Sequence, residues 1–293
     1  MAIPLSMALI QAPAHRGDLG AFASHARDVA RRHPGVQLLI YPELHLSTPH
    51  SDAGQPPPTL SDLAEPLGGD RDRDLAALAA DLNVWLVPGS VLELGGDGRV
   101  YNTALVYSPT GERVATYRKI APWRPYETTA AGAEFVVFDM PGYGRVGLTI
   151  CYDAWFPEIF RHLAWMGADL IINVVQTPTS DREQEVVLAR ANAIVNQVFV
   201  ASVNAATPTG VGRSLLVDPQ GRVLTHAPGA EECVLSDVID LEESRRVRRY
   251  GTAGLNRVWE QFLPEDAPLN LPLYGGTINP HTWRNGLNDN EKA

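Results

Sequence analysis

The spacing of apolar and polar positions along the chain predicts an α/β protein. Residues 7–10 form a short apolar run, and apolar side chains then recur on one helical face from Phe22 to Ala30. A second apolar run follows at residues 36–41 and is ended by Pro42. A strand, a helix and a strand at this spacing indicate a βαβ unit. Because both strands are nearly continuous apolar runs, we expect them to be buried on both faces of a parallel sheet.

The same patterns continue through most of the chain and predict one α/β domain. Runs of strand length recur at residues 85–94, 101–107, 113–117, 135–138, 146–150, 169–175, 198–204, 214–217 and 222–224. Helical spacing marks three further segments, at residues 75–82, 159–166 and 183–197. Asp70 is a possible cap of the first, and Val187, Ala191, Ile194 and Val195 form an apolar stripe on the last. Short turns join the middle strands, which are therefore expected to be antiparallel.

Two segments lie outside these patterns. Residues 45–69 hold five prolines and predict a long loop, which is a candidate lid over the mouth of a site. From Tyr250 onward, glycine, proline and isolated large apolar residues become frequent. We therefore divide the chain into a domain over residues 1–249 and a C-terminal extension over residues 250–293. The extension is expected to pack on the domain or on a partner subunit, because large apolar surfaces are seldom left in water.

The charge and cysteine content disfavour several classes of partner. The formal net charge is −10, so nucleic acid is not an expected partner. The basic cluster from Arg245 to Arg249 follows an acidic stretch and is typical of a solvated helix face. No apolar run reaches membrane-spanning length, and residues 1–5 do not resemble a signal peptide. Cys151 and Cys233 are far apart, so we expect no disulfide and a reducing, cytoplasmic location.

A cysteine follows one of the predicted strands directly. The apolar run 146–150 leads into Cys151, and Pro157 then opens an amphipathic helix. Side chains at the carboxyl end of such a strand are where α/β proteins place their chemistry. A helix N-terminus nearby is expected to favour a thiolate. The alternative is that Cys151 is a small buried apolar residue, as most free cysteines are.

Three charged residues stand in comparable places. Glu43 comes just after an apolar strand, where poor solvation would raise the pKa of its carboxyl and suit it to act as a general base. Lys119 ends a strand and enters a loop with aromatic residues, where it could stabilise an oxyanion. Glu127 lies eight residues further on, near enough to pair with Lys119. Taken singly, each of the three could be an ordinary surface residue.

These motifs together resemble the nitrilase superfamily of carbon–nitrogen hydrolases. The similar segments are Glu43 after its strand, Y-R-K-I-A-P-W around Lys119 and G-L-T-I-C-Y-D-A-W-F-P-E around Cys151, in that order. The resemblance runs from about Leu5 to about Asp240. It implies that Cys151 is the nucleophile, Glu43 the general base and Lys119 the stabiliser of the tetrahedral intermediate. Glu127 matches the second glutamate of the family, and the backbone N–H of Tyr152 would complete the oxyanion site.

The resemblance also implies a fold and an assembly. The fold is a four-layer α-β-β-α sandwich, with two sheets face to face and helices outside. Subunits of the family pair through the outer helices, so a homodimer or a larger homo-oligomer is expected. The family's chemistry requires no metal ion and no organic cofactor. The eight histidines of this chain also lack the HExxH spacing of zinc hydrolases.

Two departures within the motifs indicate a subclass. The segment after Lys119 lacks the histidine of many amidase-type members and is closer to the aliphatic amidase and formamidase group. The chain is, however, shorter than aliphatic amidases usually are. Tyr152-Asp153 stand where true nitrilases usually have Trp-Glu, which favours an amide over a nitrile substrate.

The sequence therefore predicts an amidohydrolase that cleaves a small-molecule carboxamide through a cysteine thioester. N-carbamoyl hydrolysis, nitrile hydrolysis and acyl transfer to an amine remain open on the same Glu-Lys-Cys set. A non-catalytic binding or scaffold protein with this fold is the alternative from another class. Trp123, Trp155, Gln176 and Thr177 are the candidate walls of the substrate pocket.

Overall fold

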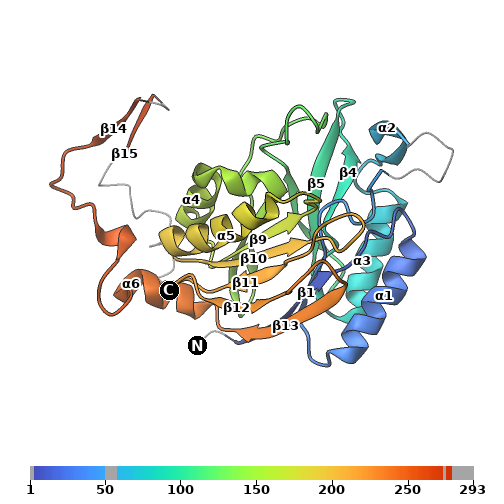
Figure 1. Cartoon of the computed structure of the whole chain (residues 1–293), viewed down its shortest axis with the longest axis horizontal. Helices are drawn as coiled ribbons and strands as arrows, with labels where there is room; N and C mark the ends of the chain where they lie inside the picture. Colours follow the sequence, from blue (N-terminus) through green and yellow to red (C-terminus); the bar gives the residue numbers. More distant parts are fainter. Residues whose placement is uncertain (1–2, 50–57, 273–274, 279–293) are drawn as a thin grey trace.

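The computed structural model describes residues 3–49, 58–272 and 275–278 of the 293-residue chain. Its centre is formed by two β-sheets, and Figure 1 shows helices on the outer side of each. The predicted 45–69 loop is only partly described, because residues 50–57 lie outside these ranges. Within it, residues 60–63 form a short helix, α2 (Leu60–Leu63), with a capping box at Thr59. The lid hypothesis stays a prediction.

The first sheet has seven strands in the order β13-β1-β2-β3-β5-β4, with β6 also paired to β5. Strands β1, β2 and β3 are parallel, as the predicted βαβ unit requires. The strands of this sheet are β1 (Leu5–Gln11), β2 (Leu38–Ile40), β3 (Trp85–Val87), β4 (Ser90–Leu94), β5 (Val100–Tyr107), β6 (Arg113–Arg118) and β13 (Cys233–Ile239). The single strand predicted at residues 85–94 is wrong, because the chain turns at Pro88-Gly89 and splits it into β3 and β4.

The second sheet has six strands in the order β12-β11-β10-β9-β8-β7. Strands β8, β9 and β10 are parallel to one another; β7 and β11 are antiparallel to their neighbours β8 and β10, and β12 is antiparallel to β11. Its strands are β7 (Val137–Met140), β8 (Gly144–Ile150), β9 (Leu170–Val175), β10 (Phe199–Asn204), β11 (Leu215–Val217) and β12 (Val223–His226). The predicted strands of this half are confirmed, with small shifts at their ends.

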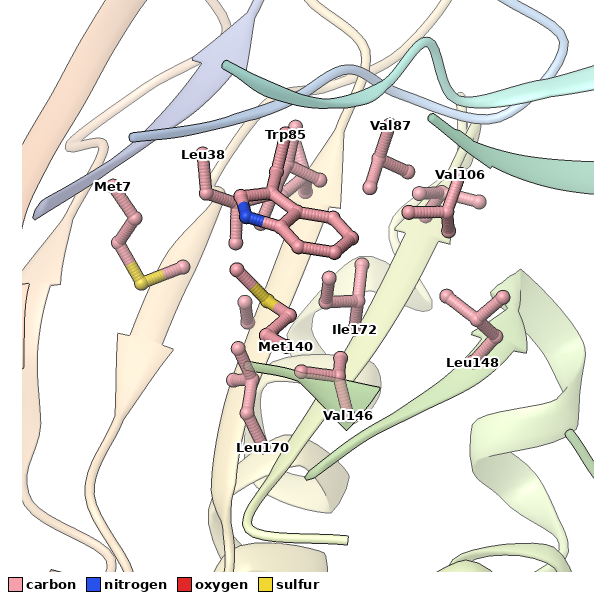
Figure 2. Packing of buried hydrophobic residues seen from close by; sticks show 14 of the residues in the cluster. Met7, Leu38, Trp85, Val87, Val106, Met140, Val146, Leu148, Leu170 and Ile172 are labelled. Carbon is pink, nitrogen blue, oxygen red and sulfur yellow. The ribbon is translucent and has the colours of Figure 1, made fainter. Parts of the chain in front are cut away.

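Three apolar clusters hold the layers together. One lies between the two sheets, and Figure 2 shows side chains of both sheets meeting there. Along β1, Leu5, Met7 and Leu9 face this inner cluster, whereas Ala8 and Ile10 face the helices outside. Side chains of a strand alternate between its two faces, so a strand covered on both faces is apolar at every position. The result is the four-layer α-β-β-α sandwich that the resemblance implied.

Helices cover the outer face of each sheet. Helices α1 (Leu19–Arg32) and α3 (Asp70–Leu82) pack on the first sheet, and α4 (Pro157–Trp165) and α5 (Arg182–Asn196) pack on the second. Asp70 is the first residue of α3 rather than its cap, which is Gly69.

The apolar stripe that marked helix α5 faces outward. Val187 is 64% exposed, and Ala191, Ile194 and Val195 are also exposed. The opposite face is buried although much of it is polar, since Arg182, Glu185, Asn192 and Asn196 lie there. Arg182, Asn192 and Asn196 donate hydrogen bonds within the protein, and Glu185 accepts one of them, so burial does not require apolar side chains at these positions.

The arginine cluster lies on helix α6 (Glu242–Tyr250). The prediction that this helix face is solvated is only partly right. Arg248 is only 7% exposed, and its guanidinium lies 3.6 Å from the buried carboxylate of Asp169. Arg245 approaches the other oxygen of that carboxylate at 2.9 Å. These two arginines therefore fasten α6 to the second sheet, because a buried carboxylate needs a charged partner.

The C-terminal segment is described in part. Trp259, in the short turn η2 (Val258–Glu260), is buried in the cluster between the second sheet and its helices. Strands β14 (Leu269–Leu271) and β15 (Gly276–Ile278) pair with each other and stand away from the body in Figure 1. Residues 273–274 and 279–293 lie outside the described ranges, so the division at residue 250 stays a prediction.

Candidate active site

The candidate residues meet where strands of both sheets end. Glu43 follows β2, Lys119 follows β6 and Cys151 follows β8, while Gln176 and Thr177 follow β9. Because the two sheets are stacked, the loops after β2 and β9 come into contact. The backbone N–H of Glu43 donates to the carbonyl of Val175 across this junction, at 3.3 Å.

The loop that carries Glu43 rests on the turn between β3 and β4. Gly89 in that turn has a φ of +88°, and a Cβ there would lie 1.7 Å from the carbonyl oxygen of Pro42. Only glycine allows this close approach. The next residue, Ser90, accepts a hydrogen bond from the backbone N–H of Leu44 at 2.9 Å. The residues on both sides of Glu43 are thus held by the turn between β3 and β4, through the Gly89 backbone and the Ser90 hydroxyl.

Lys119 lies between two carboxylates. Its Nζ is 3.0 Å from Glu43 Oε1 and 2.5 Å from Glu127 Oε2. Asn102 on β5 donates through Nδ2 to both carboxylates, at 2.8 Å to Glu43 and 3.3 Å to Glu127. The Lys119 side chain is 1% exposed, so these contacts replace almost all of its hydration. Asn102 was not among the sequence candidates, since an asparagine inside a strand carries no distinctive pattern.

The protonation of this centre follows from burial and charge. Burial raises the pKa of Glu43, the Lys119 ammonium opposes this, and the charge of Glu127 adds to it. The upward shift predicted for a poorly solvated Glu43 is thereby confirmed. Burial alone would lower the pKa of Lys119, but the charges of Glu43, Cys151 and Glu127 outweigh it, and the pKa is raised. A carboxylate able to accept a proton therefore lies beside a permanent cation.

Cys151 begins a 3₁₀ turn, η1 (Cys151–Trp155), and has a φ of +49°. This left-handed backbone turns the chain sharply at the end of β8 and places the thiol in the buried centre where the charge of Glu43 acts on it. Burial, followed by the charge of Glu43, raises the pKa of the thiol well above its usual value. The expectation that a nearby helix N-terminus favours the thiolate is wrong, because burial and the charge of Glu43 outweigh any such effect on the pKa of the thiol. The free site holds a thiol, which needs a base.

Glu127 orders the loop that follows Lys119. Its Oε2 also accepts the backbone N–H of Trp123 at 2.6 Å. The ring of Trp123 packs against that of Tyr126, with 4.7 Å between centroids. One carboxylate thus holds both the lysine and the backbone of the loop beside it.

A buried aspartate joins the lysine strand to the cysteine turn. Asp153 accepts hydrogen bonds from Tyr117 Oη at 2.7 Å, Ala121 N at 2.8 Å and Ile150 N at 2.9 Å. Burial raises the pKa of this carboxyl to about 6, although the three hydrogen bonds and the Lys119 charge oppose the shift. Asp153 entered the sequence analysis only through its place in the motif. Its three contacts couple the positions of Lys119 and Cys151.

The candidate pocket residues lie at unequal distances from this centre. Gln176 donates its backbone N–H to Glu43 Oε2 at 2.9 Å and its side chain to the carbonyl of Glu43 at 3.2 Å. Thr177 Oγ1 lies 3.7 Å from the Cys151 sulfur. Trp155 packs against the ring of Tyr152, with centroids 5.7 Å apart. Gln176 and Thr177 therefore contact the reacting groups, and the roles of the tryptophans stay predictions.

Two charged residues of helix α5 lie behind Thr177 and were missed in the sequence. Glu185 accepts from Thr177, and Arg182 pairs with Glu185 at 3.0 Å. On a helix, such residues look like part of a solvated face. Within the described part of the chain, no group of three or more His, Cys, Asp or Glu side chains is arranged to hold a metal ion. In the same residues, no helix is long and apolar enough to cross a membrane.

Sequence comparison places these residues in a known family. Residues 6–249 match the carbon-nitrogen hydrolase family. Omega-amidase NIT2 from Mus musculus is 32% identical over 243 residues, which cover 77% of this chain and 84% of that protein. A formamidase from Bacillus cereus (strain AH820) is 33% identical over 181 residues, which cover 61% of this chain and 53% of that protein.

Solved structures share the fold. Nit3 from Saccharomyces cerevisiae, a nitrilase superfamily member, has a TM-score of 0.74 at 25% identity and covers 84% of this chain and 93% of its own. A cysteine-to-alanine mutant of the Nesterenkonia AN1 amidase has a TM-score of 0.69 at 26% identity, covering 87% and 97%. A glutamate-to-glutamine mutant of that amidase carries the acetamide moiety of fluoroacetamide, added covalently at its active-site cysteine; its TM-score is 0.70 at 25% identity, covering 84% and 94%. The chain belongs to the carbon-nitrogen hydrolase family, in the amidase-type branch of the nitrilase superfamily.

Proposed function

We propose that this protein hydrolyses a small primary carboxamide, with Cys151 as the nucleophile, Glu43 as the general base and Lys119 as the oxyanion stabiliser. Hydrolysis of non-peptide carbon–nitrogen bonds through a cysteine is the coarser activity that follows from the family and its amidase members. The observation that carries the finer assignment is the position of Lys119, 3.0 Å from Glu43, in the buried centre where the charges of both groups act on the Cys151 thiol.

The first step is attack on the amide carbonyl. Glu43 takes the proton from the Cys151 thiol as the sulfur forms a bond to the carbonyl carbon. A base is needed because burial keeps the pKa of the thiol high. Three N–H or ammonium donors hold the Glu43 carboxylate in place, from Lys119, Asn102 and the backbone of Gln176. The base is therefore oriented before substrate arrives, which lowers the cost of reaching the transition state.

The tetrahedral intermediate carries a negative charge on the former carbonyl oxygen. The Lys119 ammonium and the backbone N–H of Tyr152 stabilise that charge. Protonated Glu43 then gives its proton to the nitrogen, and ammonia leaves as the carbon–nitrogen bond breaks. Water, deprotonated by the same glutamate, attacks the thioester. The carbon–sulfur bond then breaks, the acid leaves, and Glu43 returns the proton to the Cys151 sulfur. Glu127 keeps Lys119 charged and in place through both steps.

The acyl group that this site accepts is small. Gln176 and Thr177 occupy the side of the centre that follows β9, and Trp123 and Trp155 are the proposed aromatic walls. A carboxamide is preferred over a nitrile because Tyr152-Asp153 follow the cysteine. N-carbamoyl hydrolysis and acyl transfer would use the same residues and differ in the group that binds beside Cys151.

Mass spectrometry of protein briefly exposed to candidate substrates tests this function. Small aliphatic carboxamides are expected to leave an acyl mass on the peptide that contains Cys151, because the thioester precedes hydrolysis. N-carbamoyl compounds and nitriles in the same panel identify the alternative reactions by the mass that they add. Cys233 serves as the internal control, since it lies on β13 and not in the site. Adducts confined to Cys233 would refute the assignment of the nucleophile.

We also propose that the protein forms a homodimer through its outer helices. The stripe of Val187, Ala191, Ile194 and Val195 faces away from the body on α5, and isolated apolar stripes of this kind are unusual on a monomer surface. A second copy is the simplest occupant, because the same stripe on two subunits can pair about a two-fold axis. Such an association matches the pairing implied by the sequence resemblance.

Light scattering after size-exclusion chromatography tests the dimer. The double change Val187→Glu and Ile194→Glu is expected to halve the mass, because it places charges in the centre of the proposed contact. Val238→Glu is the matched control, since Val238 is 61% exposed but lies on β13 of the other sheet. A parent protein that elutes as a monomer, or a double variant that keeps the parent mass, would count against this interface.

We further propose a cytoplasmic location. A cysteine nucleophile requires reducing conditions, and Cys151 and Cys233 are both free thiols. Fractionation of the producing cells with an antibody to the protein tests the location, and recovery in an oxidising compartment would contradict it.

A further inference from the structure

A buried ion pair beside the nucleophile has no role in the mechanism above. Arg182 is 1% exposed and Glu185 is 4% exposed, and both lie on the face of α5 that is turned toward the second sheet. Burying two charges costs free energy even when they are paired. Among the described residues, hydrogen bonds connect the pair to the chemistry through Thr177, whose hydroxyl contacts Glu185 on one side and the Cys151 sulfur on the other.

The guanidinium group of Arg182 is held in one orientation by hydrogen bonds. Its Nη1 donates to Glu185 and to Ser202 Oγ, at 3.0 and 3.1 Å. Its Nε and Nη2 donate to the carbonyls of Gly212 and Arg213, at 3.2 and 3.0 Å. A guanidinium with this many fixed partners positions a carboxylate more rigidly than a flexible ammonium could. Glu185 is therefore anchored in one place.

Thr177 is fixed just as firmly. Its backbone N–H donates to Asn204 Oδ1 at 2.8 Å, and its carbonyl accepts from Asn204 Nδ2 at 3.2 Å. Its carbonyl also accepts the N–H of Val211 at 3.0 Å. The hydroxyl oxygen lies 2.9 and 3.0 Å from the two carboxylate oxygens of Glu185. Backbone and side chain of Thr177 are thus both set by neighbours.

The direction of the hydroxyl proton follows from the chemistry of the partners. A carboxylate paired with a guanidinium can only accept, so the one proton of Thr177 is donated to Glu185. The hydroxyl oxygen then has only lone pairs to offer the sulfur 3.7 Å away. A hydroxyl proton donated to the sulfur would favour the thiolate, whereas an accepting oxygen favours the thiol.

We propose that Arg182 and Glu185 turn the Thr177 proton away from Cys151, so that Thr177 accepts from the thiol and keeps it protonated and oriented until Glu43 removes the proton. Thr177 is then a positioning residue for the nucleophile, and the ion pair acts through it. The inference rests on the role proposed for Cys151. It explains why charged groups are buried behind the site: they fix a proton that would otherwise be free to rotate.

The test measures the pH dependence of alkylation of Cys151 by iodoacetate, which carries no amide bond, in a Cys233→Ala background, in which Cys151 is the remaining thiol. In Glu185→Gln, the amide oxygen can stay on Arg182 while the amide nitrogen donates to Thr177, which frees the hydroxyl proton to turn to the sulfur. The midpoint of alkylation is expected to fall by about one pH unit, roughly tenfold in thiolate at a given pH. Thr177→Ser keeps the hydroxyl and is expected to match the parent.

A double-mutant cycle separates the hydroxyl from simple charge. In a Thr177→Val background, Glu185→Gln is expected to shift the midpoint by less, because the hydroxyl through which Glu185 acts is gone. Equal shifts with and without the hydroxyl would overturn the proposal, as would a midpoint that does not fall in Glu185→Gln. Thr177→Val by itself leaves the Arg182–Glu185 ion pair intact and gives a second test, again through the alkylation midpoint of Cys151. Its midpoint is expected to fall, and a rise would mean that Thr177 donates to the thiolate.

Alkylation is a chemical reaction of the thiol and does not depend on turnover. Failure of this proposal would therefore leave the amidase assignment untouched, and absence of an acyl adduct in the mass-spectrometric test would not change the alkylation profile. Thermal melts of each variant, recorded alongside, confirm that the compared proteins are folded.

Discussion

Replacement of Cys151 by alanine is expected to lower the turnover number for amide hydrolysis by at least about 10⁴-fold. Without the sulfur no thioester can form, and the remaining groups can only bind and polarise the amide. Ammonia release from a panel of small carboxamides, followed by a coupled assay, measures the loss. The backbone is expected to stay in place, because β8 and the turn after it are held by hydrogen bonds to Asp153 and not by the thiol.

Cys233→Ala is the matched control and is expected to keep parental activity. Cys233 lies on strand β13, opposite Gln11 of β1, and contributes nothing to the charge centre. Turnover by Cys151→Ala that is within a few-fold of the parent would show that the sulfur is not the nucleophile. If both variants and the parent were inert on amides, carbamoyl compounds and nitriles alike, a binding role would replace the enzymatic one.

Replacement of Lys119 by methionine is expected to remove both activity and stability. The ammonium is buried between Glu43 and Glu127, and its loss leaves two carboxylates without their cation. Removing one partner of a buried ion pair typically costs about 3–5 kcal/mol in the free energy of unfolding. Loss of one oxyanion donor typically lowers the turnover number by about 10²–10³-fold. Urea denaturation and ammonia release measure the two effects in the same preparation.

Glu43→Gln is the control for this prediction. It removes the base and should abolish turnover, but it leaves Lys119 paired with Glu127, so the free energy of unfolding should change little. The pH dependence provides a second check. The pKa of Glu43 is already raised by burial, and without Lys119 it rises further; a carboxyl with a raised pKa in the folded state stabilises the protein only while it is protonated. The stability deficit of Lys119→Met should therefore shrink on acidification, and a deficit that stays constant would contradict the explanation.

Most of the strand and helix pattern could be predicted from the chain because the fold buries its sheets on both faces. Strand β9 is apolar at every position except Asn173, and helix α1 presents a regular apolar face. The stacking of the two sheets could not be derived this way, since a strand buried between two layers looks the same whichever layers cover it. Helix α5 shows the converse limit: its apolar stripe faces outward, and its buried face carries polar side chains whose hydrogen bonds no periodicity reveals.

The same limit applies to the site. Glu43, Lys119, Glu127 and Cys151 were predicted through motifs in order, and the structure brings all four together. Other contributors, including Asn102, Arg182 and Glu185, were not. The local sequence of a single polar residue is the same whether the side chain is exposed to water or hydrogen-bonded in the interior. The difference depends on contacts with residues that are distant in sequence. The expectation of a thiolate at Cys151 was wrong for a related reason. The sequence reveals neither the burial of the thiol nor the effect of the nearby Glu43 charge on its pKa.

The backbone conformation at Cys151 serves catalysis but strains the folded chain. A φ of +49° suits glycine, and a residue with a side chain held there costs of order 1–3 kcal/mol. In a lineage that no longer needed the reaction, a single change to glycine would release that strain, whereas a change to alanine would keep it. Selection for turnover then maintains cysteine at a position where the backbone conformation favours glycine. A change to glycine would abolish activity but lower the strain of the folded chain.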